Sequence, residues 1–213
     1  MNNAVLVFTT GNEDQLGLLR ESALFHGFNL QVYPNHWTDH VQVKLALAAE
    51  FLVTRREPYA LFLDGHDTLL LGGEDDIMQR YHILGRPVII AAETTCWPAP
   101  ELADKYPALD RMYKSFINSG CILGKRTDMV ELMRAAQAAA TNGDDQLAWA
   151  NLYLGGGTNK LEIDRTRLLF GCMSDSQGVD MWQGPIARHW NGRSPGREEY
   201  WQEYLKGGHG RGR

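Results

Sequence analysis

The chain has 213 residues, of which 44% are hydrophobic and 22% charged, a composition typical of an ordinary globular protein. Its net charge of −5 argues against broad, sequence-independent binding to nucleic acid. No stretch approaches the length of about 18 apolar residues that a membrane-spanning helix needs, so we expect no membrane partner.

The cysteines indicate a reducing compartment. Cys96, Cys121 and Cys172 are far apart and form no C-x-x-C pair, so they are neither a disulfide framework nor a zinc site. The apolar run at residues 4–8 is too short for a signal peptide, and we expect a cytoplasmic protein. With no repeat or linker, we expect one domain over residues 1–206 and a disordered basic tail, GGHGRGR, at residues 207–213.

Short apolar runs alternate with helical patterns along the chain, which predicts an α/β sheet flanked by helices. The expected strands cover residues 4–10, 30–33, 59–64, 88–93 and 115–124. The expected helices cover residues 15–26, 41–55, 127–140 with Thr127 as the cap, 144–153 and 197–206. The third strand, YALFLD, is apolar almost throughout, which is typical of the centre of a sheet.

Asp64, His66 and Asp67 follow this third strand in the segment LDGHD. Ligands of open α/β sheets bind beyond the carboxyl ends of strands, and two carboxylates across a turn can converge on one divalent cation such as Mg²⁺ or Mn²⁺. An isolated D-x-x-D is more often a simple polar turn. A strand followed by aspartate also opens the haloacid-dehalogenase-type phosphatases, but their aspartates lie two residues apart instead of three.

Five later segments favour the metal-binding interpretation: AAETTCWP, FINSGCILG, GDDQLAWANLYL, LEIDRTRLLFGCM and RHWNG. In this order and spacing, the chain from about Val5 to Gly192 resembles the glycosyltransferase domain of the procollagen lysyl hydroxylase (PLOD) family and its viral and bacterial relatives. The resemblance implies a GT-A-type, Rossmann-like fold with a mixed sheet flanked by helices. It also implies transfer of a hexose from UDP-glucose or UDP-galactose with Mn²⁺ as the cofactor and Mg²⁺ as the alternative.

The resemblance also implies roles for individual residues. The metal ligands would be Asp64, Asp67 and His189, the last from the HWNG motif. Residues in contact with the nucleotide sugar would be Thr9, Trp37, Lys44, His66, Glu93, Ser119, Gly120, Asn191 and Gly192. Residues that face the transferred sugar and take part in catalysis would be Asn118, Asp144 and Asp145, although acidic residues also favour any helix N-terminus. Where the family has a lysine directed at the diphosphate, this chain offers Arg193 or Arg197.

The acceptor is left open by the sequence. The family implies a hydroxylysine-type hydroxyl on a protein. A hydroxymethylated base of viral or phage DNA is an alternative, mildly supported by the aromatic and basic segment REEYWQEYLKGGHGRGR. A glycan is a further alternative for the acceptor. For the function as a whole, the alternative is a non-catalytic module that only binds UDP-sugars.

Overall fold

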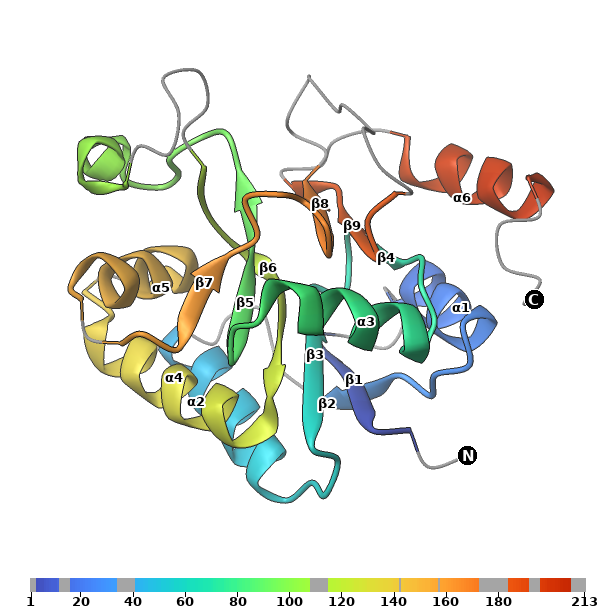
Figure 1. Cartoon of the computed structure of the whole chain (residues 1–213), viewed down its shortest axis with the longest axis horizontal. Coiled ribbons are helices and arrows are strands. Elements are labelled where there is room, and N and C mark those ends of the chain that lie inside the picture. The colour runs from blue at the N-terminus through green and yellow to red at the C-terminus, as the bar shows by residue number, and fades with distance from the viewer. Residues whose placement is uncertain are drawn as a thin grey trace.

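The structure is a computed structural model that describes residues 3–11, 16–33, 41–107, 115–141, 143–156, 158–172, 184–191 and 196–207, with the backbone alone at residues 41–43. A six-stranded sheet forms its centre, in the order β2-β1-β3-β6-β5-β7 (Figure 1). These strands are β1 (Val5–Thr10), β2 (Gln31–Tyr33), β3 (Tyr59–Leu63), β5 (Val88–Glu93), β6 (Phe116–Lys125) and β7 (Leu161–Ile163). Strand β6 pairs antiparallel with both neighbours, whereas the remaining pairs in this sheet are parallel.

Both faces of the six-stranded sheet are covered by helices because its central strands are apolar on both sides. In β1, Leu6 and Phe8 face one hydrophobic cluster, and Val5 and Val7 face the other. The first cluster is closed by α2 (Val41–Val53), α4 (Arg126–Ala139) and α5 (Asp145–Leu154). The second is closed by α1 (Gly17–Phe25) and α3 (Glu74–Leu84), on the opposite side of the sheet in Figure 1.

A smaller sheet lies beside the carboxyl end of β3. Its strands are β4 (Thr68–Leu70), β9 (Ala187–His189) and β8 (Phe170–Cys172), in that order. Helix α6 (Arg197–Lys206) packs against it through Trp201, which joins Leu69, Leu71 and Trp190 in a third buried cluster. The small sheet therefore brings a late segment of the chain next to the turn that follows β3.

The predicted α/β architecture is confirmed, and five predicted strands and five predicted helices are present with ends that differ by a few residues. Helix α3, the 3-10 helix at Pro100–Lys105 and the strand β4 were not predicted. The prediction that Thr127 caps a helix is wrong, because α4 begins at Arg126 and Lys125 is its N-cap. Here tertiary contacts replace the cap: the backbone N–H of Arg126 donates to the carbonyl of Pro58.

The predicted interruption of the fifth strand is present as a shift in register between β5 and β6. Ile90 lies opposite Ile122, but the next residue, Ala91, lies opposite Asn118. Residues 119–121 are therefore extra on the β6 side, and the strand bulges there. This bulge lies at the same edge of the sheet as the end of β3, because the backbone N–H of Asp64 donates to the carbonyl of Gly120 at 2.8 Å.

Two expectations about the environment of the chain can be compared with the structure. The three cysteines carry no disulfide. Among the described residues, no helix is both long enough and apolar enough to cross a membrane.

The turn after β7 depends on a buried carboxylate. Asp164, 1% exposed, accepts hydrogen bonds from the backbone N–H groups of Leu169 and Phe170 through one oxygen, and from Thr166 and the N–H of Leu168 through the other. These bonds fix the path from β7 in the large sheet to β8 in the small one.

We predict that Asp164→Asn lowers the free energy of unfolding by at least about 2 kcal/mol, because the amide –NH₂ cannot accept a hydrogen bond from a buried N–H. Urea unfolding measures this change. The matched control is Asp75→Asn, an exposed carboxylate of α3, which should change stability by less than about 0.5 kcal/mol. Equal stability of the two variants would show that the turn does not need the Asp164 carboxylate.

Candidate metal centre

The turn between β3 and β4 carries two carboxylates and is held in place by backbone hydrogen bonds at both ends. The N–H of Asp64 donates to Gly120, and the carbonyl of Asp67 accepts from the N–H of Trp190 at 2.7 Å. Between them, Gly65 lies so close to β1 and Leu16 that a Cβ would come within 2.3 Å of the Leu16 side chain. A side chain there would have to displace the end of Leu16 and would press on the carbonyl of Thr10, so the turn can lie close to β1 with glycine at this position.

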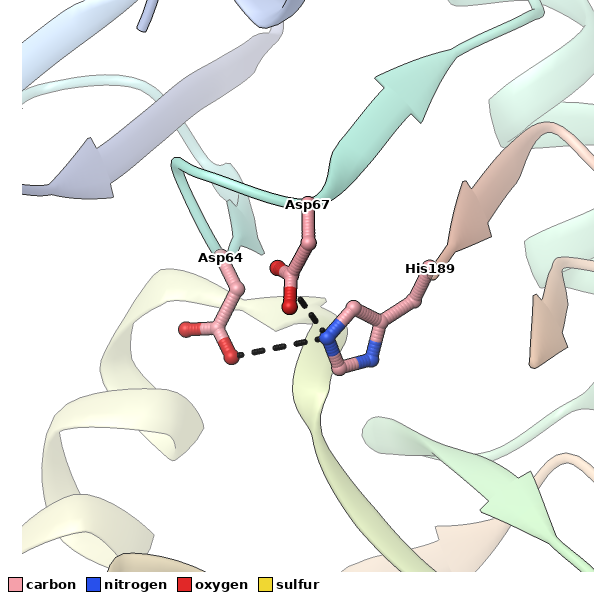
Figure 2. Close-up of side chains that lie close together, drawn as sticks. All are labelled: Asp64, Asp67 and His189. Carbon is pink, nitrogen blue, oxygen red and sulfur yellow. Dashed lines mark ion pairs between the residues drawn. The ribbon is translucent and has the colours of Figure 1, made fainter. Parts of the chain in front are cut away.

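His189, the last residue of β9, points its imidazole at this turn (Figure 2). Its Nε2 lies 3.2 Å from Asp67 Oδ1 and 3.8 Å from Asp64 Oδ2. Among the residues that the structure describes, these three form the one group whose potential metal-ligating atoms gather, all within 4.8 Å of one another. The imidazole is 5% exposed and the carboxylates are 27% and 32% exposed, so the cluster opens on the carboxylate side.

The charges of this cluster shift the pKa values of its members. Burial works to lower the pKa of His189, but its hydrogen bond to Asp67 and the negative charges of Asp67, Asp64 and Glu93 outweigh burial and raise it. Burial works to raise the pKa of Asp67, but the hydrogen bond and charge of His189 outweigh it and lower that pKa. Without a metal, the cluster thus favours a proton on His189 Nε2 shared with a charged Asp67.

Lys44 connects the cluster to the helix α5. Its Nζ lies 3.0 Å from Asp64 Oδ1 and 2.8 Å from Asp145 Oδ2. Burial opposes its charge, but the two carboxylates outweigh burial and raise the pKa of Lys44. The lysine therefore stays charged and holds together two of the residues that the sequence assigns to the site. The neighbouring Asp144 is the N-cap of α5 and accepts from the N–H of Leu147 at 2.8 Å.

A second network joins β5, β6 and α5 through Gln146, a residue that sequence reasoning did not single out. Its amide nitrogen donates to Glu93 Oε1 at 2.5 Å and to the carbonyl of Trp97 at 2.8 Å, while its oxygen accepts from the N–H of Ser119. Glu93, 3% exposed, also accepts from the side chain of Asn191 at 2.9 Å. The position of Gln146 directly after two aspartates was the signal that could have marked it.

Trp97 is also missing from the sequence-based predictions. Its carbonyl belongs to the network of Gln146, yet its side chain is 66% exposed, which is unusual for a residue of this size. The signal in the sequence was its place in the segment ETTCWP, directly after the strand that ends at Glu93.

The structure brings the remaining predicted residues near the turn in different ways. Thr9 is fully buried at the end of β1, and its Oγ1 would lie 3.0 Å from a Cβ on Gly65. The ring of His66 lies beside Gly11, and its carbonyl accepts a hydrogen bond from Arg197 of α6. Asn118 is the last paired residue before the β6 bulge, and Ser119 and Gly120 lie within it. Trp37, Gly192 and Arg193 lie outside the described residues.

The fold and the cluster together define a class of protein: a GT-A-like α/β domain with a possible Asp-Asp-His metal site at the carboxyl edge of its mixed sheet. Residues 2–181 match the family described as the PLOD GT domain, which is most of the chain. This protein therefore belongs to the PLOD family of glycosyltransferase domains.

Individual relatives agree with this family. Over 112 residues the chain is 31% identical to an uncharacterized protein of Acanthamoeba polyphaga mimivirus, covering 52% of this chain and 24% of the viral protein. It is 29% identical over 119 residues to the human multifunctional procollagen lysine hydroxylase and glycosyltransferase, covering 54% and 16%. The corresponding Caenorhabditis elegans protein is 23% identical over 234 residues, covering 94% and 32%. In each case the matched segment spans about a third or less of the relative.

We predict that a divalent metal binds this cluster more tightly as the pH rises. The proton on His189 must leave before Nε2 can bind a metal, and the pKa of His189 is raised above its ordinary value of 6.5. Affinity should therefore fall as the pH is lowered through this raised pKa, and level off above it. Asp67 adds no slope in this range because its pKa is lowered.

Calorimetric titration of Mn²⁺ in buffers of different ionisation enthalpy measures both the affinity and the protons released. Below the pKa of His189, release should approach about one proton per metal ion. His189→Gln should remove this release, whereas the control His82→Gln, an exposed histidine of α3, should retain it. An affinity independent of pH in the wild-type protein would contradict the assignment of His189 as a ligand.

Proposed function

We propose that this chain transfers a hexose from a UDP-sugar, glucose in the first place and galactose as the alternative, to an acceptor hydroxyl, and that transfer depends on a divalent metal. The observation that carries the proposal is the convergence of Asp64, Asp67 and His189 at the end of β3, in a chain of the PLOD GT domain family. Ligands of α/β sheets bind at this edge.

The chemistry of the cluster fits Mn²⁺ as the metal, with Mg²⁺ as the alternative. One imidazole nitrogen and two carboxylate oxygens are a mixed donor set, and an imidazole ligand favours Mn²⁺ and later transition metals over Mg²⁺ and Ca²⁺. When bound, a divalent ion supplies positive charge against the diphosphate as the bond between the sugar C1 and the phosphate oxygen breaks. Asp64 Oδ2, Asp67 Oδ1 and His189 Nε2 would hold it.

The neighbouring charged residues have separate tasks in this proposal. Asp145 is the candidate that faces the sugar, where its carboxylate stabilises positive charge at C1 or orients the acceptor. Its Oδ2 is held by Lys44, which fixes its position relative to the metal ligand Asp64. Asp144 has a structural task in addition, since one of its oxygens caps α5. Arg197, already in contact with the turn, is the candidate for the diphosphate.

The nucleotide is proposed to lie along the end of β1 and the β3–β4 turn, where His66 is available to stack on uracil. Thr9, Trp37 and Lys44 would line the same region, and the network of Glu93, Ser119, Gly120 and Asn191 would support the sugar end. Asn118 is proposed to act at this end as well, and Gly192 completes the motif that provides His189.

A hydroxylysine-type hydroxyl on a protein is the proposed acceptor. Two of the relatives are named as procollagen lysine hydroxylases and glycosyltransferases, which supports this class. The DNA alternative loses part of its basis, because the aromatic residues of α6 pack inward: Trp201 is fully buried, and Tyr200 and Tyr204 pack against the third cluster. These rings are therefore poorly placed to stack on bases.

We also propose that residues 1–206 form one domain, since the two large hydrophobic clusters share the same six-stranded sheet. The cytoplasmic location remains a prediction from the cysteines and the sequence.

We predict that Asp67→Ala lowers the rate of UDP release from UDP-glucose with Mn²⁺ by about 100-fold or more, because a ligand that stabilises leaving-group charge is lost. A coupled assay for UDP measures turnover with a hydroxylysine-containing collagen peptide as the acceptor, and EDTA should abolish it. The control Asp75→Asn removes an exposed carboxylate of α3 and should keep wild-type turnover. Near-full activity of Asp67→Ala at saturating Mn²⁺ would contradict the metal assignment, and UDP-glucose binding without turnover would favour a non-catalytic module.

We predict that UDP-glucose and UDP-galactose, with Mn²⁺, raise the thermal unfolding midpoint, whereas GDP- and CMP-sugars do not. A ligand that binds only the folded state must raise this midpoint, and the proposed contacts of uracil are Thr9, Trp37 and His66. A thermal-shift panel of donors measures the effect. A larger shift with GDP-mannose than with UDP-glucose would contradict the proposed donor class.

A further inference from the structure

Residues at the β6 bulge contact the edge of the His189 ring that carries Nδ1, away from the carboxylates. The Nδ1 of His189 lies 2.9 Å from Oδ1 of Asn118, and both side chains are buried. A neutral imidazole has one N–H and one lone pair, so the partner of Nδ1 decides whether Nε2 is a donor or a metal ligand.

The orientation of the Asn118 amide is itself fixed by the backbone. The N–H of Gly120 donates to Oδ1 of Asn118 at 3.0 Å. A backbone N–H can only donate, so the atom that faces it must be the carbonyl oxygen, since the reversed amide would bring –NH₂ against N–H. The same oxygen faces His189 Nδ1, which can therefore donate to it but cannot accept from it. A neutral ring with its proton on Nδ1 keeps a lone pair on Nε2, directed at Asp64 and Asp67, whereas a proton on Nε2 would instead be shared with the Asp67 carboxylate and would leave Nδ1 facing an oxygen.

Gly120 also makes room for the ring. A Cβ at this position would lie 2.3 Å from Cε1 and 2.4 Å from Nδ1 of His189, far inside contact distance. Any other residue at 120 would push the imidazole out of its place. The carbonyl of Gly120 accepts from the N–H of Asp64, so one glycine contacts two of the three members of the cluster.

We propose that Asn118 and Gly120 are positioning residues: through the β6 bulge they fix the ring position and the Nδ1–H tautomer of His189, so that Nε2 is ready to bind a metal. The proposal rests on the metal site of the proposed function. It gives Asn118 a different task from contact with the sugar, because its oxygen accepts from the N–H of Gly120 and lies against Nδ1 of His189. In this way a backbone N–H in β6 sets the protonation pattern of an imidazole on β9.

The tautomer can be measured directly in the metal-free protein. Long-range ¹H–¹⁵N NMR at alkaline pH, where the imidazole is neutral, distinguishes Nδ1–H from Nε2–H, and comparison with His189→Gln assigns the signals. Wild type should have the Nδ1–H form. Asn118→Leu removes the acceptor and should introduce the Nε2–H form, whereas Asn118→Asp keeps an accepting oxygen and should retain Nδ1–H.

Metal affinity provides the second readout, measured by Mn²⁺ titration without nucleotide. Asn118→Leu and Gly120→Ala should each weaken Mn²⁺ binding by about 10- to 100-fold, and Asn118→Asp should restore it to wild type or better. The control Asn151→Ala removes an asparagine that donates to a backbone carbonyl of α4, and should change neither the tautomer nor the affinity. Circular dichroism confirms that each variant is folded.

The two readouts separate this inference from the proposed function. If Asn118→Leu and Gly120→Ala bind Mn²⁺ as tightly as wild type and Asn118→Leu keeps the Nδ1–H form, the positioning role is wrong while the metal site stands. If wild type binds no Mn²⁺, the proposed function fails, and the tautomers of wild type and Asn118→Leu still decide whether Asn118 controls the imidazole. A wild-type ring in the Nε2–H form would overturn the inference in either case.

Discussion

The candidate site depends on one hydrogen bond, from the N–H of Asp64 to the carbonyl of Gly120. It joins the first residue after β3 to the bulge of β6, the antiparallel strand of the large sheet. Because β6 runs against its neighbours, its early residues lie at the edge where β3 ends, and the bulge can reach both the aspartate turn and the imidazole from β9. The pairing of β4 with β9, in which Thr68 lies opposite His189, joins the turn to the imidazole, and the bond from Asp64 to Gly120 joins this small sheet to the large one.

The negative charge of the candidate metal centre has to be compensated in the metal-free protein. Asp64, Asp67 and the nearby Glu93 and Asp145 gather at one edge, and repulsion between carboxylates at such distances costs free energy. Lys44 between Asp64 and Asp145, and a protonated His189 beside Asp67, compensate this charge in the metal-free protein. A divalent cation would take over part of that compensation and release the proton of His189, so metal binding and protonation compete for the same atom.

Local signals in the sequence were reliable where the chain forms regular, apolar elements. The central strands were predicted because residues 59–63 and 88–93 are apolar almost throughout, and α6 because its polar and aromatic residues alternate with helical spacing. Prediction failed where tertiary contacts replaced local signals. Helix α4 begins without a side-chain cap because Pro58 accepts the N–H of Arg126. Helix α3 has an acidic, weakly amphipathic sequence, and its buried residues Ile77 and Tyr81 pack against the large sheet.

The sequence by itself determined the α/β class, the family and the two aspartates after β3, because apolar runs and short motifs are properties of neighbouring residues. The family resemblance implied that His189 joins those aspartates, but only the tertiary structure decided how close they come, that Lys44 and Gln146 tie the site to α5, and that Asn118 faces an imidazole. These contacts join residues up to 125 positions apart, as between Asp64 and His189. Their distances depend on the register of β6 and β9, which no local pattern specifies.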